Sequence, residues 1–137
     1  MRIISRYILA LGALLLIQGT GSLIRMTVAY SGPWLVDVLL NADPLHAAIH
    51  VVWGSVMLGT ILLRGNSRQV TGLALVFGVF YTGLAVLGVA VHHPFGLQLN
   101  LFENAFHWTV GPLTLGLGLA ALRSLREPVS SGGSAIE

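Results

Sequence analysis

The sequence predicts an all-α protein, a bundle of four transmembrane helices. Of its 137 residues, 55% are hydrophobic and only 9% are charged, which is typical of a chain embedded in a lipid bilayer. Four apolar segments are each about 20 residues long, the length that a helix needs to cross roughly 30 Å of hydrocarbon. The arginines flank these segments, and the chain has no lysine. We therefore expect the lipid bilayer to surround most of the protein.

The four helices are predicted, in chain order, at about residues 4–24, 44–63, 70–91 and 101–122. The first follows two arginines in the manner of a secretory signal, but no clear cleavage site follows it, so we expect it to be retained. Asp43 and Pro44 mark the start of the second helix, since these residue types are preferred at the N-cap and the first helical position. The polar sequence RGNSRQ separates the second helix from the third. Asn100 and Glu103 resemble a capping box at the start of the fourth.

Two further segments are not expected to cross the membrane. The apolar stretch from Trp34 to Leu40 is too short to do so, and we expect it to lie in the membrane interface. Residues 128–137 contain Pro, Ser and Gly without apolar periodicity and are predicted to form a disordered tail. Residues 1–127 thus form one predicted membrane domain.

The distribution of charge predicts the orientation of the chain. If the helices alternate in direction, Arg25 lies alone on one side of the membrane, and the positive-inside rule places the other side in the cytoplasm, with both termini. That other side carries six arginines, Arg2, Arg6, Arg64, Arg68, Arg123 and Arg126. No basic patch is formed, so nucleic acid is not an expected partner. The absence of cysteine excludes disulfides, thiolate zinc sites and iron–sulfur clusters.

The second and fourth predicted helices begin with similar sequences. Aligned at an offset of 57 residues, DPLHAAIHVVWGSVMLG and NLFENAFHWTVGPLTLG share the pattern [DN]xx[HE]xxxHxxxGxxxxG. The first and third helices align poorly at this offset, beyond Gly21 with Gly78. We interpret the pattern as a duplication. It predicts two helical hairpins of equal orientation, related by a pseudo-twofold axis along the membrane normal, with the second and fourth helices facing each other.

The aligned segments carry the residues that could bind a cofactor. His46 and His50 share one face of the second helix, and Glu103 and His107 share one face of the fourth, because residues four apart lie on the same side of a helix. His50 and His107 lie about 10 Å into their helices, where an ionisable side chain facing lipid would be costly. These side chains should therefore face the interior of the bundle and have partners there.

Three kinds of partner remain open at this point, besides proton or quinone chemistry. Haem b, or a related tetrapyrrole, could take His50 and His107 as axial ligands from facing helices. A zinc or copper ion could take His46, His50, Glu103 and His107 as its ligands. In the third alternative the histidines only form hydrogen bonds between the hairpins. Adjacent His92 and His93 are expected to be solvated in the outer loop.

Several other polar residues lie in the predicted helices. We expect them to form hydrogen bonds between helices; they are Gln18, Thr20, Ser22, Tyr81 and Thr82.

The two aligned stretches resemble a family of small bacterial four-helix membrane proteins of unknown function. The resemblance is carried by the second-helix stretch with His46, His50 and Gly54 at four-residue spacing, and by Glu103, Asn104 and His107 in the fourth, where Glu replaces the usual Asp. It implies a four-helix fold in the bacterial cytoplasmic (inner) membrane. It implies no activity.

Two function classes fit these observations. The chain has no HExxH, GxSxG or Ser-His-Asp arrangement, so enzymatic activity is not the favoured interpretation. The first class is a binding protein that holds a metal ion or haem near the outer surface. The second is a structural or pigment-binding accessory subunit of a larger membrane complex or of a homo-oligomer.

Overall fold

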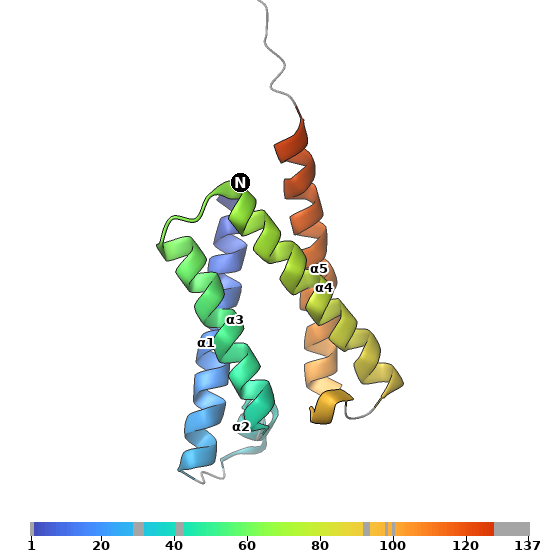
Figure 1. Cartoon of the computed structure of the whole chain (residues 1–137). Helices are drawn as coiled ribbons and strands as arrows, with labels where there is room; N and C mark the ends of the chain where they lie inside the picture. Colours follow the sequence, from blue (N-terminus) through green and yellow to red (C-terminus); the bar gives the residue numbers. More distant parts are fainter. Residues whose placement is uncertain are drawn as a thin grey trace, which may run out of the picture.

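The computed structural model describes residues 2–28, 32–40, 43–91, 94–97, 99 and 101–127, and these are helical apart from short connections (Figure 1). The α-helices are α1 (Arg2–Thr27), α2 (Trp34–Leu39), α3 (Pro44–Leu62), α4 (Ser67–Ala90) and α5 (Leu101–Arg126), and a 3₁₀ turn, η1, covers Pro94–Gly96. Four of them, α1, α3, α4 and α5, are long and apolar enough to cross a membrane. The predicted all-α fold with four membrane-spanning helices is confirmed.

The helix starts follow local capping. The Asp43 carboxylate accepts the backbone N–H groups of Leu45 and His46, at 2.9 and 3.2 Å, so α3 begins at Pro44 as predicted. Helix α4 begins three residues earlier than predicted because Asn66 and Gln69 form a capping box, in which each side chain accepts the other residue's backbone N–H. Helix α5 continues to Arg126, where basic side chains in the last turn favour the negative end of the helix dipole.

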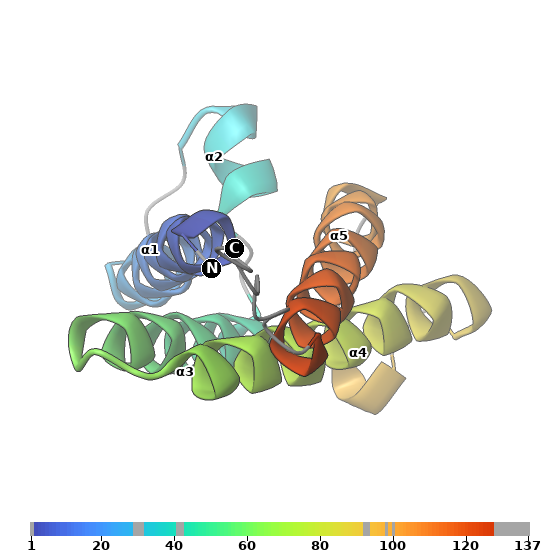
Figure 2. The same ribbon diagram turned by 90° about the horizontal axis from the view of Figure 1, so that it is seen from above.

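The predicted interfacial segment forms the short helix α2, which lies against the outside of α1 (Figure 2). Its C-terminal carbonyl groups are bound by side chains of α1. The Gln18 amide donates to the Leu39 carbonyl oxygen at 3.1 Å, and the Arg25 guanidinium donates to the Leu40 carbonyl oxygen. These bonds satisfy carbonyl groups that a helix end leaves open, and they fix α2 beside one end of the bundle.

The four long helices pack as two antiparallel pairs, α1 with α3 and α4 with α5. Seen from above, α1 lies diagonally opposite α4, and α3 diagonally opposite α5 (Figure 2). Glycines let the backbones approach within each pair. A Cβ atom added at Gly54 would lie 2.6 Å from the Leu16 nitrogen, and one added at Gly111 would lie 2.6 Å from the Thr82 nitrogen. Small residues at such contacts are typical of helix packing in membranes.

The two pairs share a burial pattern, but in two different registers. Gly54 contacts Leu16 in one pair as Gly111 contacts Thr82 in the other. These contacts align α3 with α5 at an offset of 57 residues, and α1 with α4 at an offset of 66 residues. At these offsets His46, His50, Gly54 and Met57 correspond to Glu103, His107, Gly111 and Thr114, and Ile4, Ile8, Leu11, Gly12, Leu15 and Gly19 correspond to Val70, Ala74, Phe77, Gly78, Tyr81 and Ala85, all of them buried.

The second register explains why the first and third predicted helices align poorly at an offset of 57. Gly12, not Gly21, takes the position that corresponds to Gly78, because the connection between α1 and α3 is longer than that between α4 and α5 and contains α2. The duplication and the pseudo-twofold axis remain predictions.

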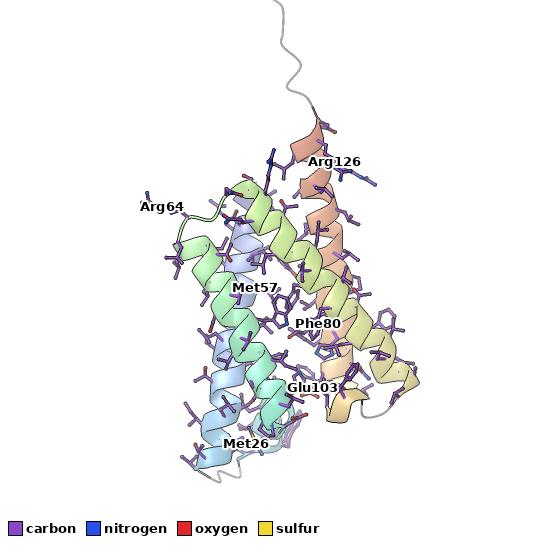
Figure 3. The ribbon with its side chains drawn as sticks, in the orientation of Figure 1. Met26, Met57, Arg64, Phe80, Glu103 and Arg126 are labelled. Carbon is purple, nitrogen blue, oxygen red and sulfur yellow. The ribbon has the colours of Figure 1, made fainter. Side chains whose placement is uncertain are left out.

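The two ends of the bundle differ in chemistry. Arg64 and Arg126 lie at one end, which we call the arginine end, and Met26 and Glu103 lie at the other, which we call the histidine end (Figure 3). Arg6, Arg68 and Arg123 also belong to the arginine end, by their places in α1, α4 and α5. The predicted grouping of arginines is therefore present. The side of the membrane on which they lie remains a prediction.

The apolar core lies between the two ends. It is formed by Ile4, Ile8, Leu11, Leu15, Met57, Val70, Ala74, Phe77 and Tyr81. A hydrogen bond of 2.7 Å between the Tyr7 and Thr114 hydroxyl groups also joins α1 of one pair to α5 of the other.

Candidate metal centre

Three histidines meet at the histidine end of the bundle. His46 and His50 come from α3 and His107 from α5, and each offers a ring nitrogen within 4.8 Å of the other two. All three side chains are buried, with exposed fractions of 3%, 4% and 0%. The structure thus brings together three of the four residues that the sequence predicted as metal ligands. The fourth, Glu103, lies beside them in a different role.

Local structure sets the positions of these rings. His46 and His50 follow one another on the buried face of α3, just past the Asp43 cap. Their face of α3 can approach α1 because residue 19 is glycine: a Cβ atom there would lie 2.6 Å from the Ala47 carbonyl oxygen and 3.0 Å from the His50 Cβ atom. The His107 ring makes an edge contact with the Tyr81 ring, with 5.0 Å between their centroids.

Glu103 contacts the side of His46 that faces away from His50. Its Oε1 atom lies 3.3 Å from His46 Nδ1, and both side chains are buried. When Glu103 is ionised its carboxylate only accepts hydrogen bonds, and His46 Nδ1 is then the donor and carries the hydrogen. Glu103 therefore orients His46 and fixes its tautomer, instead of completing the group of converging nitrogens.

Gln18 orients the His50 ring and fixes its tautomer in the same way. The Gln18 amide nitrogen donates to the Leu39 carbonyl oxygen, so the amide oxygen faces His50 Nδ1, with which it is in hydrogen-bond contact. Because an amide oxygen is only an acceptor, His50 Nδ1 also carries a hydrogen. Gln18 was expected to form a hydrogen bond between helices, and it forms two, which connect α2 to His50 through α1.

When both Nδ1 atoms carry a hydrogen, the lone pairs of the two Nε2 atoms face and repel each other. The Nε2 atoms of His46 and His50 are 3.0 Å apart, and in two neutral imidazoles protonated at Nδ1 both carry a lone pair. A cation between them, either a proton or a metal ion, removes the repulsion. Two nitrogens bound to one zinc ion at about 2.0 Å and a tetrahedral angle lie about 3.3 Å apart. The observed separation is close to that value.

His107 is the third ring of the group and differs from the other two. Neither of its nitrogens has a hydrogen-bond partner among the described residues, although the side chain is fully buried. Its ring centroid lies 5.5 Å from that of His46. Leaving a buried donor or acceptor unsatisfied costs about 1–3 kcal/mol. A ligand that the described residues do not supply, such as a metal ion, would remove that cost.

A cavity of about 280 Å³ adjoins the histidines. Its polar part is formed by Gln18, His50, Glu103 and His107, and its apolar walls by Leu14, Leu15, Ile17, Leu39, Leu40, Phe102 and Phe106. Several of the wall residues are also exposed on the outer surface of the bundle; they are Leu14, Ile17, Leu39 and Phe102. The cavity therefore opens sideways, between α1, α2 and α5.

Other predicted polar contacts differ from expectation. The hydroxyl groups of Ser22, Tyr81 and Thr82 are buried and have no hydrogen-bond partner among the described residues, contrary to the bonds between helices predicted for them. The cap at Asn100, the solvated His92 and His93 and the disordered tail at 128–137 were also predicted. These residues lie outside the described part of the chain.

No family model, no curated protein and no solved structure matches the chain. The resemblance to the four-helix family of unknown function remains a prediction.

Proposed function

We propose that this membrane protein binds one transition-metal ion, zinc or copper, through His46, His50 and His107. The observation that carries the proposal is the pair of facing Nε2 atoms, 3.0 Å apart, on two rings whose Nδ1 atoms each contact a side-chain oxygen. Neutral imidazole is a common ligand of zinc and copper. His107, buried without a partner among the described residues, supplies the third nitrogen.

The surroundings of the three rings support an ion site. Metal-bound histidines usually donate their second ring N–H to a carboxylate or another oxygen acceptor. His46 has Glu103 and His50 has Gln18 in that position. Three protein ligands leave one position of a tetrahedral ion open, as in catalytic zinc sites. A cavity of about 280 Å³ adjoins the three histidines, and a ligand for that position could come from it.

A haem fits the arrangement less well than an ion does. Two axial histidines have to lie on opposite faces of a flat macrocycle, with the ring between them. His46 lies beside both candidates: its ring centroid is 4.5 Å from that of His50 and 5.5 Å from that of His107. The space that a macrocycle would need between His50 and His107 is therefore restricted by a third imidazole.

The metal content of the purified protein tests the proposal. The protein is purified in detergent, dialysed against zinc or copper, and assayed for metal per chain and for its absorption spectrum. We expect about one ion per chain and no absorption in the visible region from a tetrapyrrole. A Soret band would show that the protein binds haem and would overturn the proposal of an ion site. Neither metal nor colour would mean that a proton separates the two Nε2 atoms, which would leave a structural or accessory role for the histidines.

A further inference from the structure

The Gln18 amide contacts two groups that belong to different parts of the protein. Its oxygen faces the Nδ1 atom of His50, a proposed metal ligand, and its nitrogen donates to the Leu39 carbonyl oxygen at the end of α2. Turning the amide by half a rotation would let the nitrogen donate to His50, but would leave two oxygen acceptors facing each other at Leu39. The position of the hydrogen on the His50 ring therefore determines whether Gln18 can hold α2.

A bound ion determines where that hydrogen lies. With an ion between the Nε2 atoms of His46 and His50, both rings carry their hydrogen on Nδ1, and His50 donates to Gln18. Without an ion, a hydrogen on one of these Nε2 atoms, 3.0 Å apart, removes their repulsion. When Glu103 is ionised, His46 keeps its hydrogen on Nδ1, so the hydrogen between the rings belongs to His50. The His50 Nδ1 atom then has a lone pair, and the Gln18 amide has to turn to donate to it.

Helix α2 depends on such bonds because it is short and exposed. It has six residues, too few for a stable isolated helix, and Trp34 and Leu39 are 75% and 43% exposed. Its end is held beside α1 by the Gln18 bond and by the Arg25 guanidinium, which donates to the Leu40 carbonyl oxygen (Figure 2). Leu39 and Leu40 also form part of the wall of the cavity. The position of α2 therefore affects how far the cavity beside the histidines opens.

We propose that metal binding is transmitted from His50 through Gln18 to α2, so that α2 is held more firmly against α1 in the metal-loaded protein. The inference rests on the proposed function, since it needs an ion on the two Nε2 atoms. No proton is gained or lost: the His50 ring exchanges a hydrogen on Nε2 for one on Nδ1, and the Gln18 amide turns. The coupling is reciprocal, so a firmly held α2 raises the metal affinity by the same factor.

Hydrogen exchange of the Leu40 amide measures how firmly α2 is held, because this N–H donates to the Val36 carbonyl oxygen at 2.8 Å. Exchange is followed by NMR in lipid nanodiscs, with and without zinc, at pH 8, where free imidazole is neutral. We expect zinc to slow it about two- to tenfold, as one neutral hydrogen bond would. The ¹⁵N shifts of the His50 ring should show the hydrogen on Nε2 without zinc and on Nδ1 with zinc.

The Leu63 amide is the internal control. It caps the end of α3 in the same manner, donating to the Gly59 carbonyl oxygen at 2.9 Å, but has no connection to the histidines. Its exchange should not change with zinc.

Two variants separate this connection from a simple loosening of α2. Gln18→Glu keeps an acceptor for His50 but has no N–H for Leu39, so zinc should bind without slowing Leu40 exchange. If Gln18→Glu does not fold, Gln18→Leu replaces it with the same expected exchange. Arg25→Met removes the other bond to α2, which involves no histidine. Leu40 exchange should then be faster in both states, with the wild-type ratio between them.

Zinc per chain, measured on the same samples, separates the two proposals. Zinc-loaded protein in which Leu40 exchanges as fast as in the metal-free protein would overturn the inference and leave the proposed function intact. Slowing that persists in Gln18→Glu, or that is equal at Leu40 and Leu63, would also overturn the inference, because the effect would not pass through Gln18. Absence of zinc binding would overturn both proposals.

Discussion

The two helix pairs have the same buried framework but supply different chemistry to the site. Helix α3 provides His46 and His50, and the corresponding residues of α5 are Glu103 and His107. Across the interface between the pairs, His46 therefore contacts the Glu103 carboxylate through its Nδ1 atom. One pair contributes two candidate ligands, and the other contributes one ligand and the acceptor that orients a ring of the first.

The first helices of the pairs differ as well. Gln18 of α1 binds His50, and the corresponding residue of α4 is Leu84, which cannot accept a hydrogen bond. This difference explains why His50 has a partner and His107 has none among the described residues. In addition, Tyr81 of α4 takes the position that corresponds to Leu15 of α1. These two differences make the site one-sided: the open cavity lies toward α1, and the opposite side is filled. Small changes on a shared framework thus give one site instead of two.

The largest effect is expected from removing one ligand on either side of the interface. His50→Ala and His107→Ala should each weaken zinc binding by more than about 100-fold, which exceeds the loss usually seen for residues that only orient a ligand. Competition with a chromophoric chelator measures the affinity. Thr109→Ala, an exposed substitution close to His107, serves as the control. If His107→Ala retained wild-type affinity, the ion would be bound by residues of α3 alone, and the two helix pairs would not share the site.

The glycines of the repeated pattern distinguish packed from open positions. Gly54→Ala and Gly111→Ala should each destabilise the fold by about 1–3 kcal/mol, because the new methyl group meets a backbone nitrogen of the neighbouring helix at 2.6 Å. Gly59 and Gly116 have no atom within 4 Å of an added Cβ, so alanine there should be neutral or stabilising by up to about 1 kcal/mol. Unfolding in detergent compares the four variants. Equal effects at all four positions would contradict the helix pairing described above.

A smaller effect is expected at Glu103, which orients a ligand without joining the ion. Glu103→Gln keeps an oxygen acceptor for His46 Nδ1 but removes its charge, and zinc affinity should fall about tenfold. The stoichiometry should stay at one ion per chain. A complete loss of metal would instead make Glu103 a direct ligand, as one of the sequence-based alternatives had it. Zinc titrations of the wild type and the variant measure both quantities.

The smallest effects concern the difference between Gln18 and Leu84. Gln18→Leu makes α1 like α4 at this position and removes the acceptor of His50, so zinc affinity should fall by less than about tenfold. Leu84→Gln offers His107 the corresponding amide and should raise the affinity a few-fold. Both are measured by the same chelator competition. A gain in Gln18→Leu or a loss in a folded Leu84→Gln protein would show that the two positions are not equivalent.

The sequence was sufficient to predict the fold because membrane helices are long, apolar and bounded by strong local signals. The Asp43–Pro44 start of α3 was predicted from its cap alone. The start of α4 was placed too late because Asn66 and Gln69 cap it from within a polar loop that carries no apolar signal. The register between α1 and α4 was missed, since it depends on the length of the connection that contains α2.

The site was predicted in part. The repeated spacing of His46, His50 and His107 identified the residues that the structure brings together. The spacing could not show that Glu103 lies on the Nδ1 side of His46, because that depends on how the two pairs meet. Gln18 was recognised as a polar residue in an apolar helix, but its partner lies 32 positions away. No local pattern encodes such a contact.

The most direct test of the account is X-ray absorption spectroscopy of the zinc-loaded protein. The account predicts one zinc ion coordinated by three imidazoles and one further light ligand, with Zn–N distances of about 2.0 Å. The imidazole count should fall to two in His107→Ala, at zinc concentrations that restore loading. A spectrum with one imidazole or none, or one unchanged by His107→Ala, would contradict a metal centre shared between the two helix pairs.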